Sequence, residues 1–192
     1  MTQLVLASTS VFRRQLLEKL QLPFVCDAPD TDETAFENET AEALVQRLAQ
    51  AKARAVADNH GDALIIGSDQ VATLDGQIIG KPLTHQNAVQ QLRNSSGRSL
   101  TFFTGLCLYN SSTGEQQTIC EPFKVHFRKL CDEQIERYLT TEKPYQCAGS
   151  FKSEGYGISL FEKLEGDDPN SLIGLPLIRL VAMLQRQGIA VP

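Results

Sequence analysis

The sequence predicts an α/β fold built on a mixed β-sheet. Short strand-like and helical segments alternate in the first half of the chain, and two long strand-like segments joined by a turn follow. An amphipathic segment closes the chain. Alternation is typical of parallel strands, whereas two strands joined by a short turn pair in antiparallel fashion. Together these observations indicate a mixed sheet and exclude a regular doubly wound one.

The first half of the chain contains three short strands, two helices and a hairpin. Its best helix spans about 40–59, because Leu44, Val45 and Leu48 recur there at helical spacing with alanines before and after them. The hairpin turns at Asp75-Gly76, a pair that favours two-residue turns. The expected segments are strands 3–7, 24–28 and 63–67, a first helix that ends near 20, and the hairpin 71–79.

The rest of the chain contains three more helices, the long strand pair and a glycine-rich stretch. The strand pair turns at 110–114, where Asn, Ser, Thr and Gly gather. The expected segments are helix 84–94, strands 100–109 and 118–127, helix 132–141, a strand-like stretch at 149–160 and helix 175–187. No linker divides the chain, so 192 residues predict one domain, 1–192, or two lobes around one sheet.

Composition excludes some classes of protein. Hydrophobic residues make up 42% and the net charge is −5, which is typical of a globular protein and argues against a nucleic-acid surface. A small anionic substrate remains compatible, since one triphosphate needs only a few Lys and Arg. We expect no signal peptide, no membrane span and a cytoplasmic location. The five cysteines include no C-x-x-C pair, so we expect reduced thiols.

Ser8-Thr9-Ser10 precedes the first helix and offers a place for a phosphate, because helix N-termini attract anions. Ordinary N-capping by serine is the alternative. Arg13 lies on the apolar stripe formed by Leu16 and Leu17, and an inward guanidinium needs an anion. Arg14 points about a quarter-turn away and could be ordinary surface.

Lys52 lies near the centre of the apolar stripe of helix 40–59. It either extends its ammonium to an edge or serves a buried acid or phosphate. Asp69 follows the apolar strand that ends at Gly67, and sites in α/β sheets lie at the carboxyl ends of strands. Asp69 is therefore a candidate metal ligand or general base, with a capping aspartate as the alternative.

Two further segments add weaker candidates. Asp32-Glu33 could add carboxylates to a metal site, although acidic loop pairs are most often solvated. Lys81 stands between Gly80 and Pro82 after the hairpin. The common nucleotide-binding glycine motifs are absent, the three histidines have no metal-ligand spacing, and no G-x-S-x-G elbow supports serine hydrolysis.

The segments taken together resemble the Maf-like nucleotide pyrophosphatase family along essentially the whole chain. The pieces that carry the resemblance are LASTS with Arg13-Arg14, Asp32-Glu33, Ala51-Lys52-Ala53, GSDQV at 67–71, Gly80-Lys81-Pro82, AGSF at 148–151 and GLPL at 174–177. Their order and spacing are specific, although no single piece is decisive.

The resemblance implies a Maf/ITPase-like fold, a curved mixed sheet flanked by helices with a deep central cleft. It implies cleavage of a nucleoside triphosphate to the monophosphate and pyrophosphate, with Mg²⁺ or Mn²⁺ as cofactor. Asp69 matches the proposed catalytic carboxylate and metal ligand, and Glu33 a carboxylate near the metal. The positions expected to bind phosphates are Ser8, Arg13, Arg14, Lys52 and Lys81.

Within the family, Gln70 and the segment Lys152 to Gly155 resemble the subfamily that acts on 7-methyl-GTP. Relatives that prefer pyrimidines usually have threonine in place of Gln70 and glutamine in place of Glu154. The hypothesis is that Phe12 stacks on the methylated base and Glu154 accepts hydrogen bonds from its edge. Phe12 departs from the tryptophan expected there, as Val11 does from the common proline. The alternative is that Phe12 packs in the core and Glu154 pairs with Lys152.

Three other functions remain open from the sequence. The chain could be a nucleotide-binding regulatory module with little turnover, a pyrophosphatase that prefers dTTP or UTP, or a nucleotidyltransferase. A homodimer also remains open.

Overall fold

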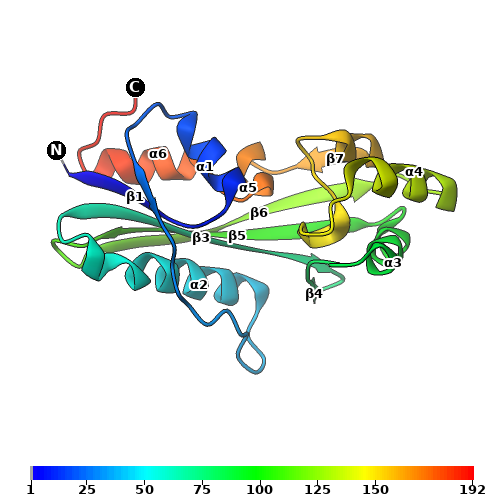
Figure 1. Ribbon diagram of the computed structural model, residues 1–192, viewed down its shortest axis with the longest axis horizontal. Coiled ribbons are helices and arrows are strands. Elements are labelled where there is room, and N and C mark those ends of the chain that lie inside the picture. Colours follow the sequence, from blue (N-terminus) through cyan, green and yellow to red (C-terminus); the bar gives the residue numbers. More distant parts are fainter. Residues whose placement is uncertain (1) are drawn as a thin grey trace. The chain divides into compact units, whose positions relative to one another are not determined.

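The computed structural model describes residues 2–192 and shows a mixed α/β fold (Figure 1). Its seven-stranded sheet has the order β2-β1-β3-β5-β6-β7, with β4 paired to β3, and does not close into a barrel. Parallel and antiparallel pairs are both present, which confirms the predicted mixed sheet. The chain forms two compact units: unit 1 comprises 1–70, 104–121 and 168–192, and unit 2 comprises 71–103 and 122–167. The prediction of one domain stays a prediction.

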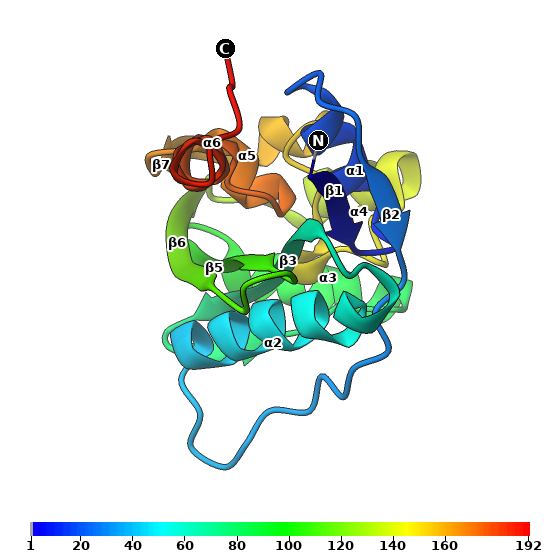
Figure 2. The same cartoon turned by 90° about the vertical axis from the view of Figure 1, so that its left-hand side faces the viewer.

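Unit 1 places helices on both faces of its strands. Figure 2 shows α2 on one face and α1 with α6 on the other. Alternate residues of β1 point to opposite faces, as the pleat requires: Leu4 and Leu6 pack toward α1 and α6, and Val5 and Ala7 toward α2. Its elements are β1 (Gln3–Ala7), α1 (Val11–Glu18), β2 (Val25–Asp27), α2 (Ala41–Ala55), a 3-10 turn (Ala57–Asn59), α5 (Pro169–Ile173) and α6 (Leu177–Arg186).

Two glycines let α2 lie directly on the strands. A Cβ at Gly67 would lie 2.0 Å from the Ala49 carbonyl oxygen, and one at Gly105 would lie 2.1 Å from the Val45 carbonyl oxygen. Any side chain at either position would push the helix away from the sheet. The close approach brings Lys52, one turn beyond Leu48, down to the strand that carries Asp69.

Unit 2 has an aromatic core. Phe151 packs edge-on against Phe102, Phe127 and Phe161, with ring centroids 5.4, 5.6 and 4.8 Å apart. The hairpin turn has left-handed backbone at Asp75 (φ 50°) and Gly76 (φ 79°), as predicted for a two-residue turn. Its elements are β4 (Gln77–Ile79), α3 (His85–Ser95), α4 (Asp132–Glu142), 3-10 turns (Ala148–Ser150 and Tyr156–Leu160) and β7 (Phe161–Glu165).

Three long strands contribute to both units: β3 (Ala63–Leu74), β5 (Ser99–Asn110) and β6 (Gln116–Phe127). The prediction that a strand ends at Gly67 was therefore wrong, because β3 continues through Asp69 into the hairpin. β3 pairs with β5 and, at Ala72 to Leu74, with β4, and these partners keep the strand extended past the polar residues.

The predicted strand at 149–160 was also wrong. Gly149 (φ 74°) and Ser150 (φ 63°) have left-handed backbone, and two 3-10 turns occupy the segment. The short helix α5 was missed. All five cysteines are free; Cys107 is buried, whereas Cys26 and Cys131 are exposed.

Candidate active site

The turn before α1 holds two serines with different roles. Ser10 is the N-cap, and its side chain accepts a hydrogen bond from the Arg13 amide at 3.4 Å. Ser8 is buried, and its Oγ accepts from the Ser10 amide at 3.1 Å. The capping alternative thus applies to Ser10, while Ser8 lies one step deeper, where β1 has just ended.

A buried lysine between two carboxylates forms the centre of the candidate site. Lys52 Nζ lies 2.6 Å from Asp69 Oδ1 and 2.5 Å from Glu33 Oε1. Lys52 and Asp69 are buried, whereas the Glu33 side chain is 60% exposed. Lys52 therefore pairs with a buried acid and does not extend its ammonium to the edge of the helix. A buried ammonium needs such partners, because its desolvation is not otherwise compensated.

The position of Asp69 is explained by its neighbouring strand. β1 pairs in parallel with β3 up to Ala7↔Gly67, so β1 ends two residues before Asp69. The carboxylate therefore lies beside the carboxyl end of β1, although its own strand continues. Sites in such sheets lie at the carboxyl ends of parallel strands, and here the strand that ends at the site is β1, not β3.

Arg13 adds a second cation to this cluster. It is half-buried, and its Nε donates to the Gly174 carbonyl oxygen at 2.9 Å. Burial lowers the pKa of Arg13, while the charges of Asp69 and Glu33 raise it. An arginine titrates so far above neutrality that it keeps its charge. Two cations and two carboxylates therefore lie within electrostatic reach of one another.

The Gly174 carbonyl is a shared acceptor that the sequence did not reveal. It accepts from Arg13 and from the buried Ser68 hydroxyl at 2.9 Å, and that hydroxyl is also 2.8 Å from the Gly105 carbonyl oxygen. Gly174 has φ 121°, a conformation that favours glycine. In the sequence the GLPL motif only contributes to the family resemblance, whereas the positive φ of Gly174 explains why glycine stands there.

Asp168 organises the same turn. One oxygen of its carboxylate accepts from the Asn170 amide and the other from the Ile178 amide, both at 2.8 Å. It therefore fixes the starts of α5 and α6 together, and through them the position of Gly174.

The side-chain amide group of Gln70 donates its hydrogen bonds to other residues of unit 1. Its Nε2 donates to Thr104 Oγ1 at 2.9 Å and to the Ser171 carbonyl oxygen at 2.7 Å. Any contact of Gln70 with a base would therefore have to be made by its Oε1.

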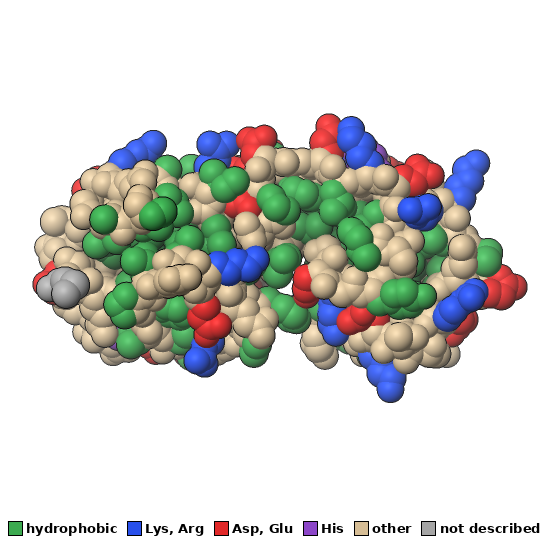
Figure 3. Space-filling view, turned by 90° about the horizontal axis from the view of Figure 1, so that it is seen from above, with side chains coloured by type: hydrophobic (Ala, Val, Ile, Leu, Met, Phe, Trp, Pro, Cys, Tyr) green, Lys and Arg blue, Asp and Glu red, His purple; other side chains and the backbone are tan. Residues whose placement is uncertain are grey.

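Two predicted residues of α1 lie outside the charged cluster. Arg14 pairs with Glu18 at 3.1 Å on an exposed face, with 64% of its side chain accessible. Phe12 is 38% exposed, so it does not pack in the core. Hydrophobic side chains are visible between basic ones on the face of unit 1 that carries α1 and α6 (Figure 3).

Unit 2 carries the remaining candidates. Lys81 and Glu154 are both exposed. Lys152 pairs with Glu142 at 3.2 Å, whereas Glu154 Oε2 accepts from the Ser153 hydroxyl at 3.4 Å. The alternative in which Glu154 serves as the partner of Lys152 is thus not what the structure shows. The deep cleft stays a prediction.

The carboxylates of this site could hold an oxygen-preferring metal ion only if a bound phosphate group supplied further ligands. Across residues 2–192 no group of three or more His, Cys, Asp and Glu side chains could hold a metal ion. Asp69 and Glu33 converge on one ammonium, however, and Mg²⁺ commonly takes one or two protein carboxylates together with phosphate oxygens. The two carboxylates fit that pattern. None of the described helices combines the length and apolar character needed to cross a membrane.

Comparisons with known proteins agree on fold and family. The model of the Maf-like protein family matches residues 3–187. A protein of Pseudomonas savastanoi pv. phaseolicola called 7-methyl-GTP pyrophosphatase is 59% identical over 192 residues, covering the whole of both chains. The solved structure of the Staphylococcus aureus Ham1 protein shares the fold, with a TM-score of 0.56 and 14% identity over 96% of this chain and 99% of that one. On the evidence of the two sequence comparisons, the chain belongs to the Maf-like protein family.

Proposed function

We propose that this chain hydrolyses 7-methyl-GTP to 7-methyl-GMP and pyrophosphate. The observation that carries the proposal is the buried Lys52, held between Asp69 and Glu33. A full-length relative that bears the name 7-methyl-GTP pyrophosphatase supports this choice of substrate.

The reaction needs a water molecule directed at the α-phosphorus. Asp69 is the candidate to orient that water and accept its proton, because it is a buried carboxylate next to the cationic cluster. The water oxygen forms a bond to the α-phosphorus, the bridging bond to the β-phosphate breaks, and pyrophosphate leaves. No covalent enzyme intermediate is required.

Cations stabilise the charge that develops on the leaving group. Lys52 and Arg13 come from α2 and α1 and lie near Asp69, so they are the first candidates for the triphosphate oxygens. Ser8 offers a hydroxyl at the start of α1. Lys81 and Arg14 stay as predicted phosphate contacts that rest on the family resemblance.

Asp69 and Glu33 are the residues that would hold a divalent cation such as Mg²⁺ or Mn²⁺. Such an ion would neutralise phosphate charge and polarise the phosphoryl oxygens. Lys52 lies 2.6 Å from Asp69 and 2.5 Å from Glu33, so its ammonium offsets part of the negative charge of the two carboxylates.

The base would be recognised by its positive charge. The accessible ring of Phe12 offers a face for stacking, worth roughly 0.5–2 kcal/mol with a cationic partner. Glu154 is exposed and could accept hydrogen bonds from the guanine N1 and N2 edge while offsetting the charge.

A substrate comparison tests the proposal. The purified protein is incubated with 7-methyl-GTP, GTP, UTP and dTTP, with and without Mg²⁺ or Mn²⁺, and both products are quantified. We expect the highest kcat/KM for 7-methyl-GTP, one pyrophosphate per nucleoside monophosphate, and no turnover with a chelator. In ¹⁸O-labelled water the label should enter the monophosphate, which identifies attack at the α-phosphorus.

Other results would point to the alternatives. Equal rates on all four substrates would reject the base preference and keep the pyrophosphatase reaction. Tight nucleotide binding with no pyrophosphate release would favour a regulatory module. Replacing Glu154 with Gln should narrow the gap between 7-methyl-GTP and GTP, by about tenfold if one charged hydrogen bond is lost.

A further inference from the structure

Glu33 is supplied by a loop without helix or strand. The segment 28–40 between β2 and α2 has no regular structure, and most of its side chains are exposed. Nevertheless Glu33 lies 2.5 Å from the buried Lys52 ammonium. A carboxylate on such a loop keeps one position only if the loop is fixed elsewhere, because exposed loops otherwise sample many conformations.

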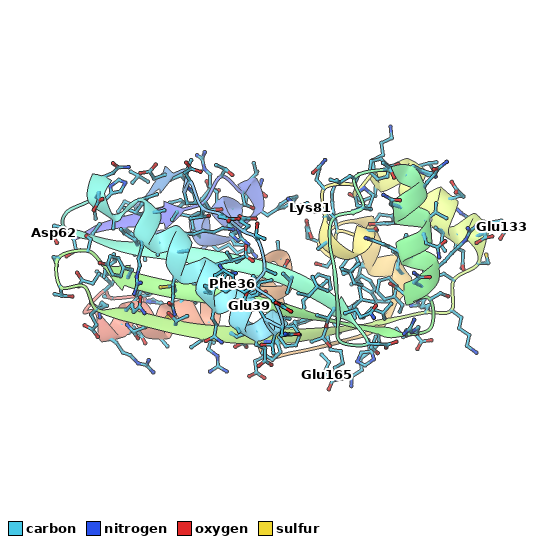
Figure 4. All side chains as sticks on the ribbon, turned by 90° about the horizontal axis from the view of Figure 1, so that it is seen from below. Phe36, Glu39, Asp62, Lys81, Glu133 and Glu165 are labelled. Atoms are coloured by element: carbon cyan, nitrogen blue, oxygen red, sulfur yellow. The ribbon has the colours of Figure 1, made fainter. Side chains whose placement is uncertain are left out.

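One arginine of α2 contacts three positions of this loop. Arg47 donates to both carboxylate oxygens of Glu39, from Nε to Oε1 and from Nη2 to Oε2, each at 2.7 Å. Nη2 also donates to the Thr34 carbonyl oxygen at 3.0 Å, and the guanidinium carbon lies 3.9 Å from the centre of the Phe36 ring. Figure 4 shows Phe36 and Glu39 beside the N-terminal part of α2.

The loop is also closed on itself around Glu39. The Phe36 amide donates to Glu39 Oε2 at 3.0 Å, and the Glu39 amide donates to the Phe36 carbonyl oxygen at 3.2 Å. Hydrogen bonds from Arg47 lower the pKa of Glu39 to about 2. Phe36 is 64% exposed, which is unusual for an aromatic side chain unless something holds it at the surface. The guanidinium of Arg47 lies over one face of this ring and holds it beside α2.

We infer that Arg47 is a positioning residue for Glu33. Thr34, which Arg47 holds by its carbonyl, is the next residue after Glu33, so the clamp acts one peptide away from the carboxylate. Arg47 and Lys52 belong to the same helix, and the helix therefore fixes both the loop and the ammonium that Glu33 meets. The clamp consists of Arg47, Thr34, Phe36 and Glu39. The inference rests on the proposed function, in which Glu33 serves the reaction.

Geometry explains why arginine is needed at this position. Bidentate binding of Glu39, donation to a carbonyl and stacking on a ring together require a planar group with several donors. Lysine has one ammonium and could make only part of this set. We therefore expect Arg47→Lys to retain only part of the function of Arg47.

A double-mutant cycle tests whether Arg47 acts through Glu33. The variants are Arg47→Ala, Arg47→Lys, Glu33→Gln and the double variant Glu33→Gln with Arg47→Ala, each assayed for kcat/KM with 7-methyl-GTP. We expect Arg47→Ala to lose about 10–100-fold, the range typical of residues that orient a ligand group. In the Glu33→Gln background the same change should cost less than twofold, because the carboxylate that it positions is gone.

The matched control is Arg54 on the same helix. It is exposed and donates to Gln116 at 2.8 Å, away from the loop. Arg54→Ala should leave kcat/KM unchanged. An equal loss from Arg47→Ala with and without Glu33 would overturn the inference, as would no loss at all.

Amide hydrogen exchange gives a readout that does not depend on activity. Residues 33–39 should exchange faster in Arg47→Ala than in the parental protein or in Arg54→Ala, while the amides of α2 keep their protection. If the parental protein released no pyrophosphate from any nucleotide, the proposed function would fail, yet this exchange difference would still be expected. Unchanged exchange in the loop would reject the clamp itself. If Arg47→Ala did not fold, Arg47→Lys would carry the same two measurements.

Discussion

The two units use their buried positions for different purposes. Of the charged side chains in residues 2–192, four are buried (Lys52, Asp69, Glu121 and Asp168), and all four belong to unit 1. Unit 2 instead buries a cluster of phenylalanines packed edge to face. The buried charges of unit 1 have partners, since Lys52 pairs with Asp69 and Glu33, and Glu121 pairs with Arg179. Because burying even a paired charge is costly, the difference supports the proposal that the reacting charges belong to unit 1, while the core of unit 2 contributes stability.

The largest expected effect comes from removing a buried carboxylate of unit 1. Asp69→Asn should lower kcat by roughly 10²–10⁴-fold, the usual contribution of a group that transfers a proton. The fold should survive, because Lys52 still pairs with Glu33. Steady-state kinetics and a thermal unfolding midpoint measure both effects.

Asp132→Asn is the matched control from unit 2. Asp132 is exposed and pairs with Arg93 at 2.8 Å on the surface. Its replacement should leave kcat unchanged. Near-parental turnover of Asp69→Asn would contradict the proposal that Asp69 of unit 1 takes part in the reaction.

The second-largest expected effect is a loss of folding stability on substitution in the aromatic core of unit 2. Phe161→Ala should lower the free energy of unfolding by about 3–5 kcal/mol, because it leaves a cavity beside Phe127 and Phe151. Urea unfolding measures this. At a temperature where the variant is folded, its kcat should fall far less than that of Asp69→Asn. A loss of turnover as large as that of Asp69→Asn would show that the division of roles is wrong.

The adjacent residues Arg13 and Arg14 of α1 provide a test in which the expected change in kcat/KM is smaller. Arg13→Ala should lower kcat/KM by about 10–100-fold, since a charged hydrogen bond contributes roughly 1.5–3 kcal/mol. Arg14→Ala should change it less than about twofold if Arg14 only pairs with Glu18, because that exposed ion pair lies outside the charged cluster. Equal losses would instead support the phosphate-binding role that the family resemblance gives to Arg14.

The smallest effect concerns pH. The pKa of Glu39 is about 2 in the folded protein, below its ordinary value of 4.5, because of its hydrogen bonds from Arg47. The stabilisation is therefore complete above about pH 4.5 and is lost as the pH falls toward 2. Glu39→Gln lacks this contribution, so its urea midpoint should fall less steeply between pH 5 and pH 3. Parallel pH profiles for the two proteins would contradict the shift.

Local sequence pattern was enough for most elements. The apolar spacing of α1 and α2 predicted both helices, and Asp75-Gly76 predicted the tight turn, because periodicity and turn chemistry are local properties. The pattern failed at 149–160, a glycine-rich segment that was predicted to be strand-like. Left-handed backbone at Gly149 and Ser150 forms turns there, and no rule of spacing predicts that serine will adopt it.

The sequence by itself identified Lys52 and Arg13, because a charge on an apolar helix stripe is visible in the spacing alone, and Asp69, because it is a carboxylate that follows an apolar strand. It also carried the resemblance to the Maf-like family. Only the tertiary structure showed that Lys52 bridges Asp69 and Glu33, that the Gly174 carbonyl fixes Arg13, and that Arg47 fastens the loop carrying Glu33. These contacts join segments that are far apart in the chain or lie across an irregular loop. Their formation depends on close backbone approach at Gly67 and Gly105 and on a turn set by Asp168, and neither follows from the local pattern of side chains.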